Sequence, residues 1–188
     1  FRQFIETLPL SDYRKQPVKP SILSESWYEN HPSFYARNNR RFNDADVRYS
    51  AYVSLLQGCI GQTYGAHGIW TWYDGYENEW EESFVPGHWK DDLKLAGSQQ
   101  MSYLRNLMES VSWTQLEPHP ELVSSPLFSH AFCAAIPGKE YVAYVIGSKG
   151  DLVVLVEGVR DEAKYDARWF NPRTGEWSEV EEVVEKTW

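Results

Sequence analysis

The 188-residue chain is predicted to combine an α/β region, residues 1–112, with an all-β region, residues 113–188. Two observations predict this organisation. In the first region, segments with helical spacing alternate with short strand-like segments, the pattern of parallel α/β architecture. From residue 129 onward, short apolar strands recur between glycine-containing turns, as in an antiparallel β-sandwich. The boundary is expected within residues 113–126, because "LEPHPELVSSP" has the composition of a linker.

The α/β region is expected to begin with a helix, a strand and a second helix. Residues 1–10, "FRQFIETLPL", are predicted to be the end of a helix that stops near Pro9. "KPSILSES" is predicted to be a short buried strand, because turn-forming residues bound a brief apolar run. The second helix is expected to begin after Asn43 or Asp44, either of which can cap its first turn. Helical spacing predicts one buried face that contains Arg48, Ala51, Tyr52, Leu55, Leu56 and Cys59.

A further strand and helix are expected to complete this region. "TYGAHGIWTWYDG", residues 63–75, is rich in β-forming residues and ends in a turn signal, so it is predicted to be a strand. "DLKLAGSQQMSYLRNLMESV", residues 92–111, is predicted to form an amphipathic helix. Its inner face is expected to contain Leu93, Gly97, Gln100 or Met101, Leu104, Met108 and Val111.

The all-β region is expected to contain five short strands. Their sequences are "HAFCAAIP", "EYVAYVIG", "LVVLVEG", "AKYDARWF" and "WSEVEEVV". The turns "PGK", "SKGD" and "NPRTGE" lie between them. This regular spacing of short strands and turns predicts a small antiparallel sandwich.

Charge and composition exclude several classes of function. The net charge of -9 and the pI near 5.0 argue against binding to a nucleic acid backbone, which needs clustered Lys and Arg. No apolar run approaches the roughly 20 residues that span a bilayer, and no signal peptide is recognisable. Cys59 and Cys133 are expected to be buried free thiols, with one disulfide as the alternative. Because the chain begins at Phe1, an upstream segment is expected to have been removed or left out.

Glu25 and the aromatic residues around it are the candidate site. Aromatic residues make up 15% of the chain, which is enough for both a dense core and a binding cleft. Glu25 follows the predicted strand "SIL", and residues at the carboxyl ends of parallel strands carry the chemistry of barrel enzymes. His67, Trp70 and Trp72 lie in or beside the next predicted strand. Aromatic faces and a carboxylate suit a sugar ring and its hydroxyl groups.

Each of these residues also has a structural interpretation. Glu25 can be a surface or capping acid, and His67 can be a loop histidine satisfied by backbone groups. Trp70 and Trp72, two residues apart, can pack one side of a strand into the core. The His, Glu and Asp residues lack metal-ligand spacing, so no metal site is predicted, and no nucleotide-binding or cofactor motif is present.

Three motifs in order carry a resemblance to a known family. They are "KPSILSESWYENHP", "DVRYSAYVSLLQGCIGQTYGAHGIWTWYD" and "LAGSQQMSYLRNLMES". Together they resemble the C-terminal part of the apiosidase-like glycoside hydrolases, which are (β/α)8 barrels of the retaining class. In the strand-seven motif of that family, the matching residues here are Lys19, Pro20, Glu25, Tyr28 and Glu29, while Ser24 and Ser26 replace the usual Gly and Pro. The second motif resembles strand eight and its preceding helix, with Arg48, Gly58, Gly61, Tyr64, Gly65, His67, Trp70 and Trp72 carried over.

The resemblance implies a catalytic role for Glu25. It would be the nucleophile of a retaining glycosidase, with Trp27, Tyr28, Trp70 and Trp72 as the sugar platform. Arg48, Tyr64 and His67 would orient Glu25 or bind hydroxyl groups, and Glu29 is the remaining substrate-binding candidate. No cofactor is implied. The strand-four acid/base has no match, so the chain is expected to be an incomplete enzyme with little activity alone, completed by an N-terminal barrel portion or a companion chain.

The all-β region resembles the small sandwich that follows these barrels and is often labelled a collagen-binding domain. "WFNPRTG" is the most specific part of that resemblance, and nothing in this sequence argues for collagen. A rival interpretation is a non-catalytic carbohydrate- or protein-binding module that uses the sandwich, and a third is a sandwich that only caps the barrel. Exposed coplanar aromatic residues on the sandwich would favour binding, whereas the alternating pattern of its aromatic residues favours a core. The sequence does not indicate sugar, linkage or localisation, although polysaccharide hydrolases of this type are commonly exported.

Overall fold

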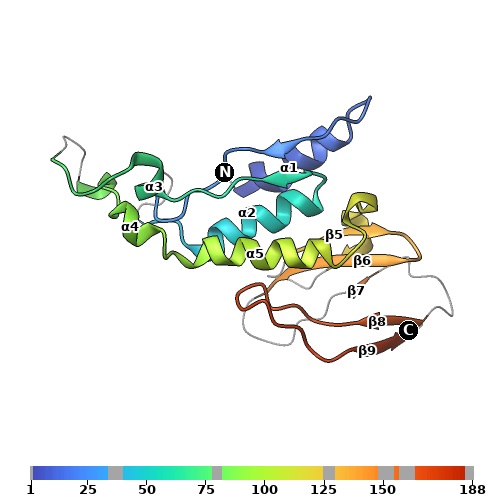
Figure 1. Ribbon diagram of the computed structural model, residues 1–188. Helices are drawn as coiled ribbons and strands as arrows, with labels where there is room; N and C mark the ends of the chain where they lie inside the picture. The colour runs from blue at the N-terminus through green and yellow to red at the C-terminus, as the bar shows by residue number, and fades with distance from the viewer. Residues whose placement is uncertain are drawn as a thin grey trace.

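A computed structural model describes residues 2–33, 40–77, 82–124, 130–147, 155–156 and 164–184 of the chain (Figure 1). The α-helices are α1 (Arg2–Tyr13), α2 (Asp44–Leu56), α3 (His67–Thr71), α4 (Trp89–Asp92) and α5 (Ala96–Glu109), and short 3-10 helices span Glu82–Phe84, Trp113–Gln115 and Pro120–Leu122. The strands are β1 (Ile22–Leu23), β2 (Gly61–Gln62), β3 (Glu117–Pro118), β4 (Val123–Ser124), β5 (His130–Ile136), β6 (Glu140–Ile146), β7 (Leu155–Val156), β8 (Lys164–Ala167) and β9 (Glu181–Val184).

The first region is built around one parallel βαβ unit. Strands β1 and β2 pair in parallel, with Ile22 opposite Gly61 and Leu23 opposite Gln62, and helix α2 connects them. Helices α1 and α5 pack on opposite sides of α2 (Figure 1). A parallel pair joined through a helix is the repeating unit of α/β barrels. The mixed helix and sheet arrangement is consistent with part of such a barrel.

Helix α2 is the central helix of the molecule. It begins where the sequence predicts, because the Asn43 side chain accepts hydrogen bonds from Ala45 and Asp46, and Asp46 bonds back to the Asn43 N–H. The prediction of a single buried face is too narrow, since buried residues run without a break from Val47 to Ser54. The reason is that α2 is covered by α1, α5 and the β5–β6 strands together.

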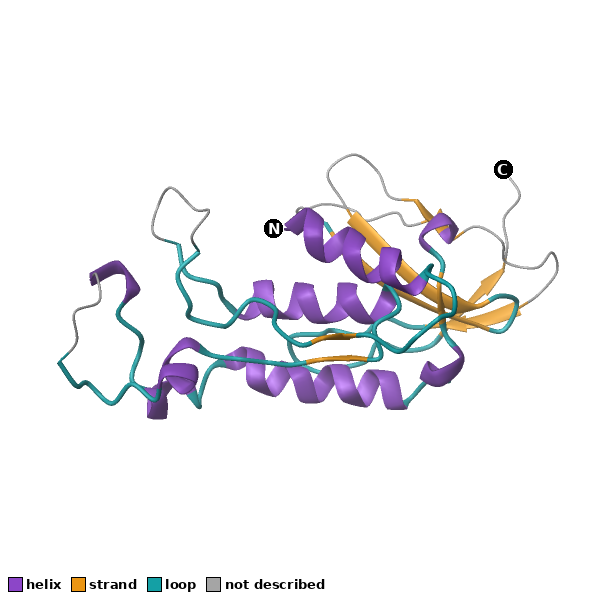
Figure 2. Cartoon of the chain, turned by 90° about the horizontal axis from the view of Figure 1, so that it is seen from above, coloured by secondary structure: helices purple, strands orange, loops and turns teal. Residues whose placement is uncertain are grey.

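Two hydrophobic clusters join the helices to the strands. The larger one includes Ile5 from α1, Val53 from α2 and Phe132 from β5. The second contains Tyr52 from α2, whose ring stacks on Tyr144 of β6 at 4.6 Å between centroids. Because β5 and β6 pack directly on α2, the all-β region shares its core with the helices (Figure 2 shows the strands beside the helical layer).

Three predicted elements differ in the structure, one of them the strand at residues 19–26, which was expected to be buried but is only Ile22–Leu23, with Ile22 56% exposed. Helix α1 does not stop at Pro9 but continues to Tyr13, where the Tyr13 ring packs against the backbone of Gly58. Residues 63–75 do not form a strand: β2 is limited to Gly61–Gln62, and α3 begins at His67. The β-forming residues of that segment lie instead in a loop and a short helix, because tertiary hydrogen bonds fix its backbone.

The strands of the all-β region form small antiparallel sheets. Strand β5 pairs with both β3 and β6, β4 pairs with β7, and β8 pairs with β9. The predicted strands at residues 130–136 and 140–146 are confirmed, and the predicted "SKGD" turn lies outside the described residues. The "NPRTGE" turn is present, with Gly175 at a positive φ of 76° and packed on the Tyr103 ring of α5. Within the described residues, no helix has the length and apolar character needed to cross a membrane.

Candidate functional site

The segment that carries Glu25 bulges out of the parallel pair. After the pairing of Leu23 with Gln62, the next parallel backbone bridge between the two segments joins Glu29 to Ala66. Between these two pairings the first segment advances by six residues, from 23 to 29, and the second by four, from 62 to 66. The first segment therefore contains two extra residues and bulges. Glu25 lies in this bulge and is exposed to solvent. It therefore lies just beyond the carboxyl end of β1.

Trp27 and Tyr28, next to each other in this bulge, have opposite environments. The Trp27 ring is 8% exposed and stacks on Phe42 and Tyr49, with centroids 5.3 and 5.9 Å away. This packing places Trp27 in the hydrophobic core and corrects the expectation that it belongs to a sugar platform. Tyr28 instead contacts Trp70 edge-to-face at 6.2 Å and lies over Gly65, where an added Cβ would be 2.8 Å from the ring.

Glu29 is buried against the start of helix α5. Its Oε2 accepts hydrogen bonds from the Tyr64 hydroxyl at 2.7 Å and from the Gly97 N–H at 3.0 Å. Burial raises the pKa of this carboxyl, and the two hydrogen bonds act against that shift. A carboxylate at a helix N-terminus satisfies an otherwise unpaired N–H and interacts favourably with the helix dipole. Glu29 and Tyr64 thus hold α5 to the parallel pair, and their contact with substrate stays a prediction.

Arg48 is occupied between helices α2 and α5. Its Nη1 donates to Asp44 Oδ2 at 2.9 Å and to the Gln100 side-chain oxygen, and Gln100 in turn donates to Asp44 at 2.9 Å. Burial alone would raise the pKa of Asp44, but the bonds from Gln100 and Arg48 outweigh it and lower the pKa. These contacts make Arg48 a link between two helices, and its expected role in orienting Glu25 or binding hydroxyl groups stays a prediction.

His67 is fully buried at the first turn of α3. Its ring lies 4.5 Å from His31 and 4.9 Å from Phe84, measured between centroids. Neither ring nitrogen has a hydrogen-bond partner of good geometry among the described residues. The pKa of His67 is lowered to about 4, first by burial and then by electrostatic interaction with His31 and Arg41, while the backbone of Asn30 acts in the opposite direction. The imidazole is therefore neutral near pH 7.

This pKa predicts a marked pH dependence of stability. An unfolded histidine takes up its proton near pH 6.5, whereas folded His67 does so only near pH 4. The unfolded state binds more protons between these values, so the free energy of unfolding should fall by about 3 kcal/mol as the pH drops through this window. Urea unfolding of wild-type and His67→Leu protein from pH 4 to 8 measures it. The variant should lack this fall, and the exposed-site control His130→Gln should keep it. Equal slopes in all three proteins would contradict the prediction.

Trp70 and Trp72 lie on the surface, not in the core. Their side chains are 58% and 68% exposed. Trp70 belongs to α3, and Trp72 follows its last residue in a left-handed backbone conformation. The strand prediction placed both rings on one side of a strand, and the helix instead directs them separately. Among the predicted platform residues, Tyr28, Trp70 and Trp72 remain available to a ligand.

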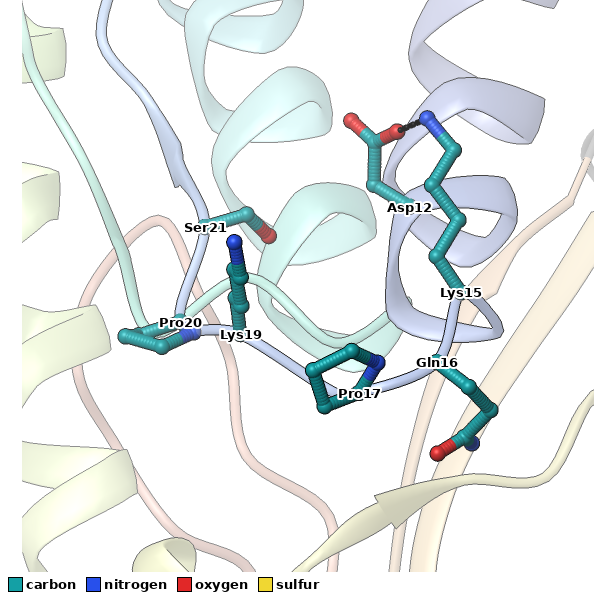
Figure 3. Close-up of a pocket in the computed structure, with 7 residues that line it drawn as sticks. All are labelled: Asp12, Lys15, Gln16, Pro17, Lys19, Pro20 and Ser21. Carbon is teal, nitrogen blue, oxygen red and sulfur yellow. Dashed lines mark hydrogen bonds and ion pairs between the residues drawn. The ribbon is translucent and has the colours of Figure 1, made fainter.

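The described residues contain a cavity that does not include any residue of this site. It has a volume of about 340 Å³ and lies at the turn between α1 and β1 (Figure 3). Its lining includes Lys19 and the ion pair between Lys15 and Asp12 at 2.5 Å. Because these residues precede β1 whereas Glu25 follows it, the cavity lies at the opposite end of the strand. In the described part of the chain, Cys59 and Cys133 are free and buried, and no group of three potential metal ligands occurs.

Comparison with known proteins decides the family. The sequence profile described as "Apiosidase-like, catalytic domain" matches residues 4–115, which is more than half of the chain. The chain belongs to the apiosidase-like family. No curated protein matches it.

Two solved structures share the fold of this apiosidase-like chain. One is described as a glycoside hydrolase family 5 protein from Bacteroides vulgatus ATCC 8482, with 24% identity and a TM-score of 0.75. The other is described as a glycoside hydrolase, with 23% identity and a TM-score of 0.72. Each alignment covers 99% of this chain but 42% of the other, so the chain spans less than half the length of these structures.

Several polar residues of the apiosidase-like chain contact the predicted site residues or their neighbours but were not themselves predicted as site residues. Asp92 is 2% exposed and accepts hydrogen bonds from the Asn30 side chain at 3.0 Å and the Gly68 N–H at 2.7 Å. Gln100 and Asp44 complete the contacts of Arg48. No local motif distinguishes Asp92 from its neighbour Asp91, which is also an acid but is exposed. Only the approach of α4 to α3 gives it a role.

Proposed function

We propose that this chain is the C-terminal part of a retaining glycoside hydrolase and that Glu25 is its nucleophile. The observation that carries the proposal is the position of Glu25. It is an exposed carboxylate beyond the carboxyl end of a parallel strand, in a chain of the apiosidase-like family. Catalytic residues of α/β barrels lie at that end of the strands. Tyr28, in the same bulge as Glu25, and Trp70, which Tyr28 contacts, supply aromatic surface.

The proposed reaction uses two carboxyl groups. The Glu25 carboxylate attacks the anomeric carbon while the bond to the leaving oxygen breaks through an oxocarbenium-like transition state. A second carboxylic acid protonates the leaving oxygen, and as a base it then activates the water that releases the sugar. Glu29 is unsuited to this second role because its carboxylate is buried against Gly97 and Tyr64. We assign the acid/base to a part of the complete protein outside this chain.

Two exposed apolar residues support the idea of a longer barrel. Ile22 and Ile60 lie at the start of the parallel pair and are 56% and 51% exposed. In a closed barrel, inward side chains of parallel strands pack in layers with those of the other strands. The proposal therefore includes further barrel strands, from a preceding segment or a companion chain, that cover this face. The substrate is a plant or microbial oligosaccharide or polysaccharide.

The all-β region is proposed to complete a small sandwich with a structural role. Its strands β5 and β6 pack on α2, and its Gly175 turn packs on Tyr103 of α5. These contacts support a domain that stabilises the last barrel helices. The collagen-binding label of the family remains without a supporting observation in this molecule.

The proposal is tested by the stereochemistry of hydrolysis. The complete protein is incubated with a panel of p-nitrophenyl glycosides, and the first anomer released is identified by proton NMR. A product with the same anomeric configuration as the substrate is expected. An inverted product would overturn the retaining mechanism, and the absence of hydrolysis across the panel and on polysaccharides would overturn the glycosidase assignment.

A further inference from the structure

The backbone of Trp72 is in a conformation that a tryptophan rarely adopts. Its φ of 51° and ψ of 34° are left-handed, and its N–H reaches back to the carbonyls of Gly68 and Ile69 to end α3. Glycine or asparagine takes this conformation more readily, and other residues pay about 1–2 kcal/mol for it. The large ring is nevertheless 68% exposed, so core packing does not explain its presence. A surface that presents this ring to a ligand does explain it.

Trp89 supports the Trp72 ring from one side. The two rings meet at 5.6 Å between centroids with an interplanar angle of 64°, an edge-to-face contact. Trp89 itself is flanked by His88, whose ring is nearly parallel at 6.3 Å, and by Lys90, whose Nζ lies 5.5 Å from the Trp89 ring centroid. Trp89 therefore fixes the orientation of Trp72, and Trp72 offers the open surface.

The two short helices that carry these rings are held together. The Gly68 N–H of α3 donates to the Asp92 carboxylate of α4, and the Trp89 N–H donates to the Tyr73 carbonyl at 2.8 Å. The helices approach so closely that a Cβ on Gly68 would lie 2.2 Å from the carbonyl oxygen of Gly87. A ligand that contacts Trp72 thus meets a surface that is already ordered, which lowers the entropy cost of binding.

This aromatic pair is continuous with the proposed catalytic end. Trp70, two residues before Trp72, is 58% exposed and contacts Tyr28, which belongs to the same bulge as Glu25. In Figure 1, α3 and α4 extend away from the strands of the all-β region. Trp70 therefore links the bulge that carries Glu25 to α3, the short helix that ends at Trp72.

The charge around the pair selects the chemistry of the ligand. Among the described residues of the same segments, the exposed carboxylates are Asp74, Glu77, Glu82 and Asp91. Of the nearby lysines, Lys94 is paired with Asp91, and Lys90 lies over Trp89. The excess of negative charge repels a uronate and is compatible with a neutral sugar, whose C–H face packs on an indole.

We propose that Trp72, supported by Trp89, is an outer subsite for a neutral sugar unit of an oligosaccharide substrate. The inference rests on the proposed glycosidase function, because that function makes the ligand a carbohydrate. A substrate that extends from Glu25 past Trp70 to Trp72 is longer than a simple glycoside. Trp72 therefore contributes to the binding of longer substrates.

The test is calorimetric binding to the complete protein with the Glu25→Gln substitution. The probes are neutral xylo-, gluco-, galacto- and arabino-hexaoses, with a galacturonate hexamer as the anionic probe. Trp72→Asn keeps a residue that tolerates the left-handed turn while removing the ring. It should raise the Kd of the best neutral hexaose at least about tenfold. Trp169→Ala, at a residue 59% exposed in the all-β region, is the matched control and should leave this Kd unchanged.

Three results would overturn the subsite. They are an unchanged Kd in Trp72→Asn, binding of the galacturonate hexamer as tight as that of the neutral sugars, or no binding of any hexaose. These outcomes are separable from failure of the proposed function, which is judged by turnover of aryl glycosides. If Glu25 proves not to be the nucleophile but the Trp72→Asn substitution still weakens hexaose binding, the subsite stands.

Discussion

Replacing Glu25 with glutamine in the complete protein is expected to lower kcat on a p-nitrophenyl glycoside by roughly 10³-fold or more. Glutamine has nearly the same shape but cannot attack the anomeric carbon, so the covalent intermediate does not form. Because Glu25 is exposed and makes no core contact, the fold should be retained, and the melting temperature should change little. Glu117→Gln, at another exposed carboxylate on β3, should leave kcat unchanged.

A second experiment distinguishes a nucleophile from a residue that only binds substrate. In Glu25→Ala, added azide can enter the vacated space and form a C–N bond to the anomeric carbon as the aryl leaving group departs. Recovered turnover and a glycosyl azide of inverted configuration are expected. Turnover of Glu25→Gln close to that of the wild type would rule out Glu25 as the nucleophile.

Gly97→Ala is expected to destabilise the protein by about 3–4 kcal/mol, although alanine normally stabilises a helix by about 1 kcal/mol relative to glycine. A Cβ at this position would lie 2.3 Å from Glu29 Oε2 and 2.7 Å from Val47 Cγ2. Glu29 would have to move, and its hydrogen bonds to the Gly97 N–H and the Tyr64 hydroxyl would be lost. Overpacking and the loss of buried charge-assisted hydrogen bonds each cost about 1–3 kcal/mol.

Chemical unfolding of Gly97→Ala, Gly61→Ala, Glu29→Ala and the Glu29→Ala/Gly97→Ala double variant checks this expectation. Gly61→Ala is the control, because a Cβ there meets no atom within 4 Å, and it should change the free energy of unfolding by less than about 0.5 kcal/mol. In a Glu29→Ala background, Gly97→Ala should cost less than in the wild type, because the principal clash is gone. A neutral or stabilising Gly97→Ala would mean that Glu29 does not lie at the start of α5.

The sequence predicted the elements whose local signals agree with their final environment. Asn43 followed by Asp46 marks a helix start by local hydrogen bonding alone, and α2 begins there. Strands β5 and β6 follow from apolar β-forming residues around the Gly138 turn, which needs a positive φ. The three ordered motifs also indicated the family that the profile match shows.

The roles of individual site residues depended on contacts between distant segments. Glu25 and Glu29 are both acids of one motif, yet one is exposed and the other caps α5 through Gly97. Trp27 and Trp72 look equally suited to a sugar platform in sequence, but only the packing of Phe42 and Tyr49 places Trp27 in the core. Spacing cannot separate such cases.

The sequence by itself therefore determined the start of α2, the main β-hairpin and the family. These features depend on hydrogen bonds and side-chain patterns within a few residues of each other. The tertiary structure decided which carboxylate is buried, which tryptophan is exposed and that residues 63–75 do not form a strand. The physical reason is that these features depend on hydrogen bonds between distant segments. Asp92 accepts from the Gly68 N–H, 24 positions away in the chain, and Glu29 accepts from the Gly97 N–H in the first turn of α5, 68 positions away.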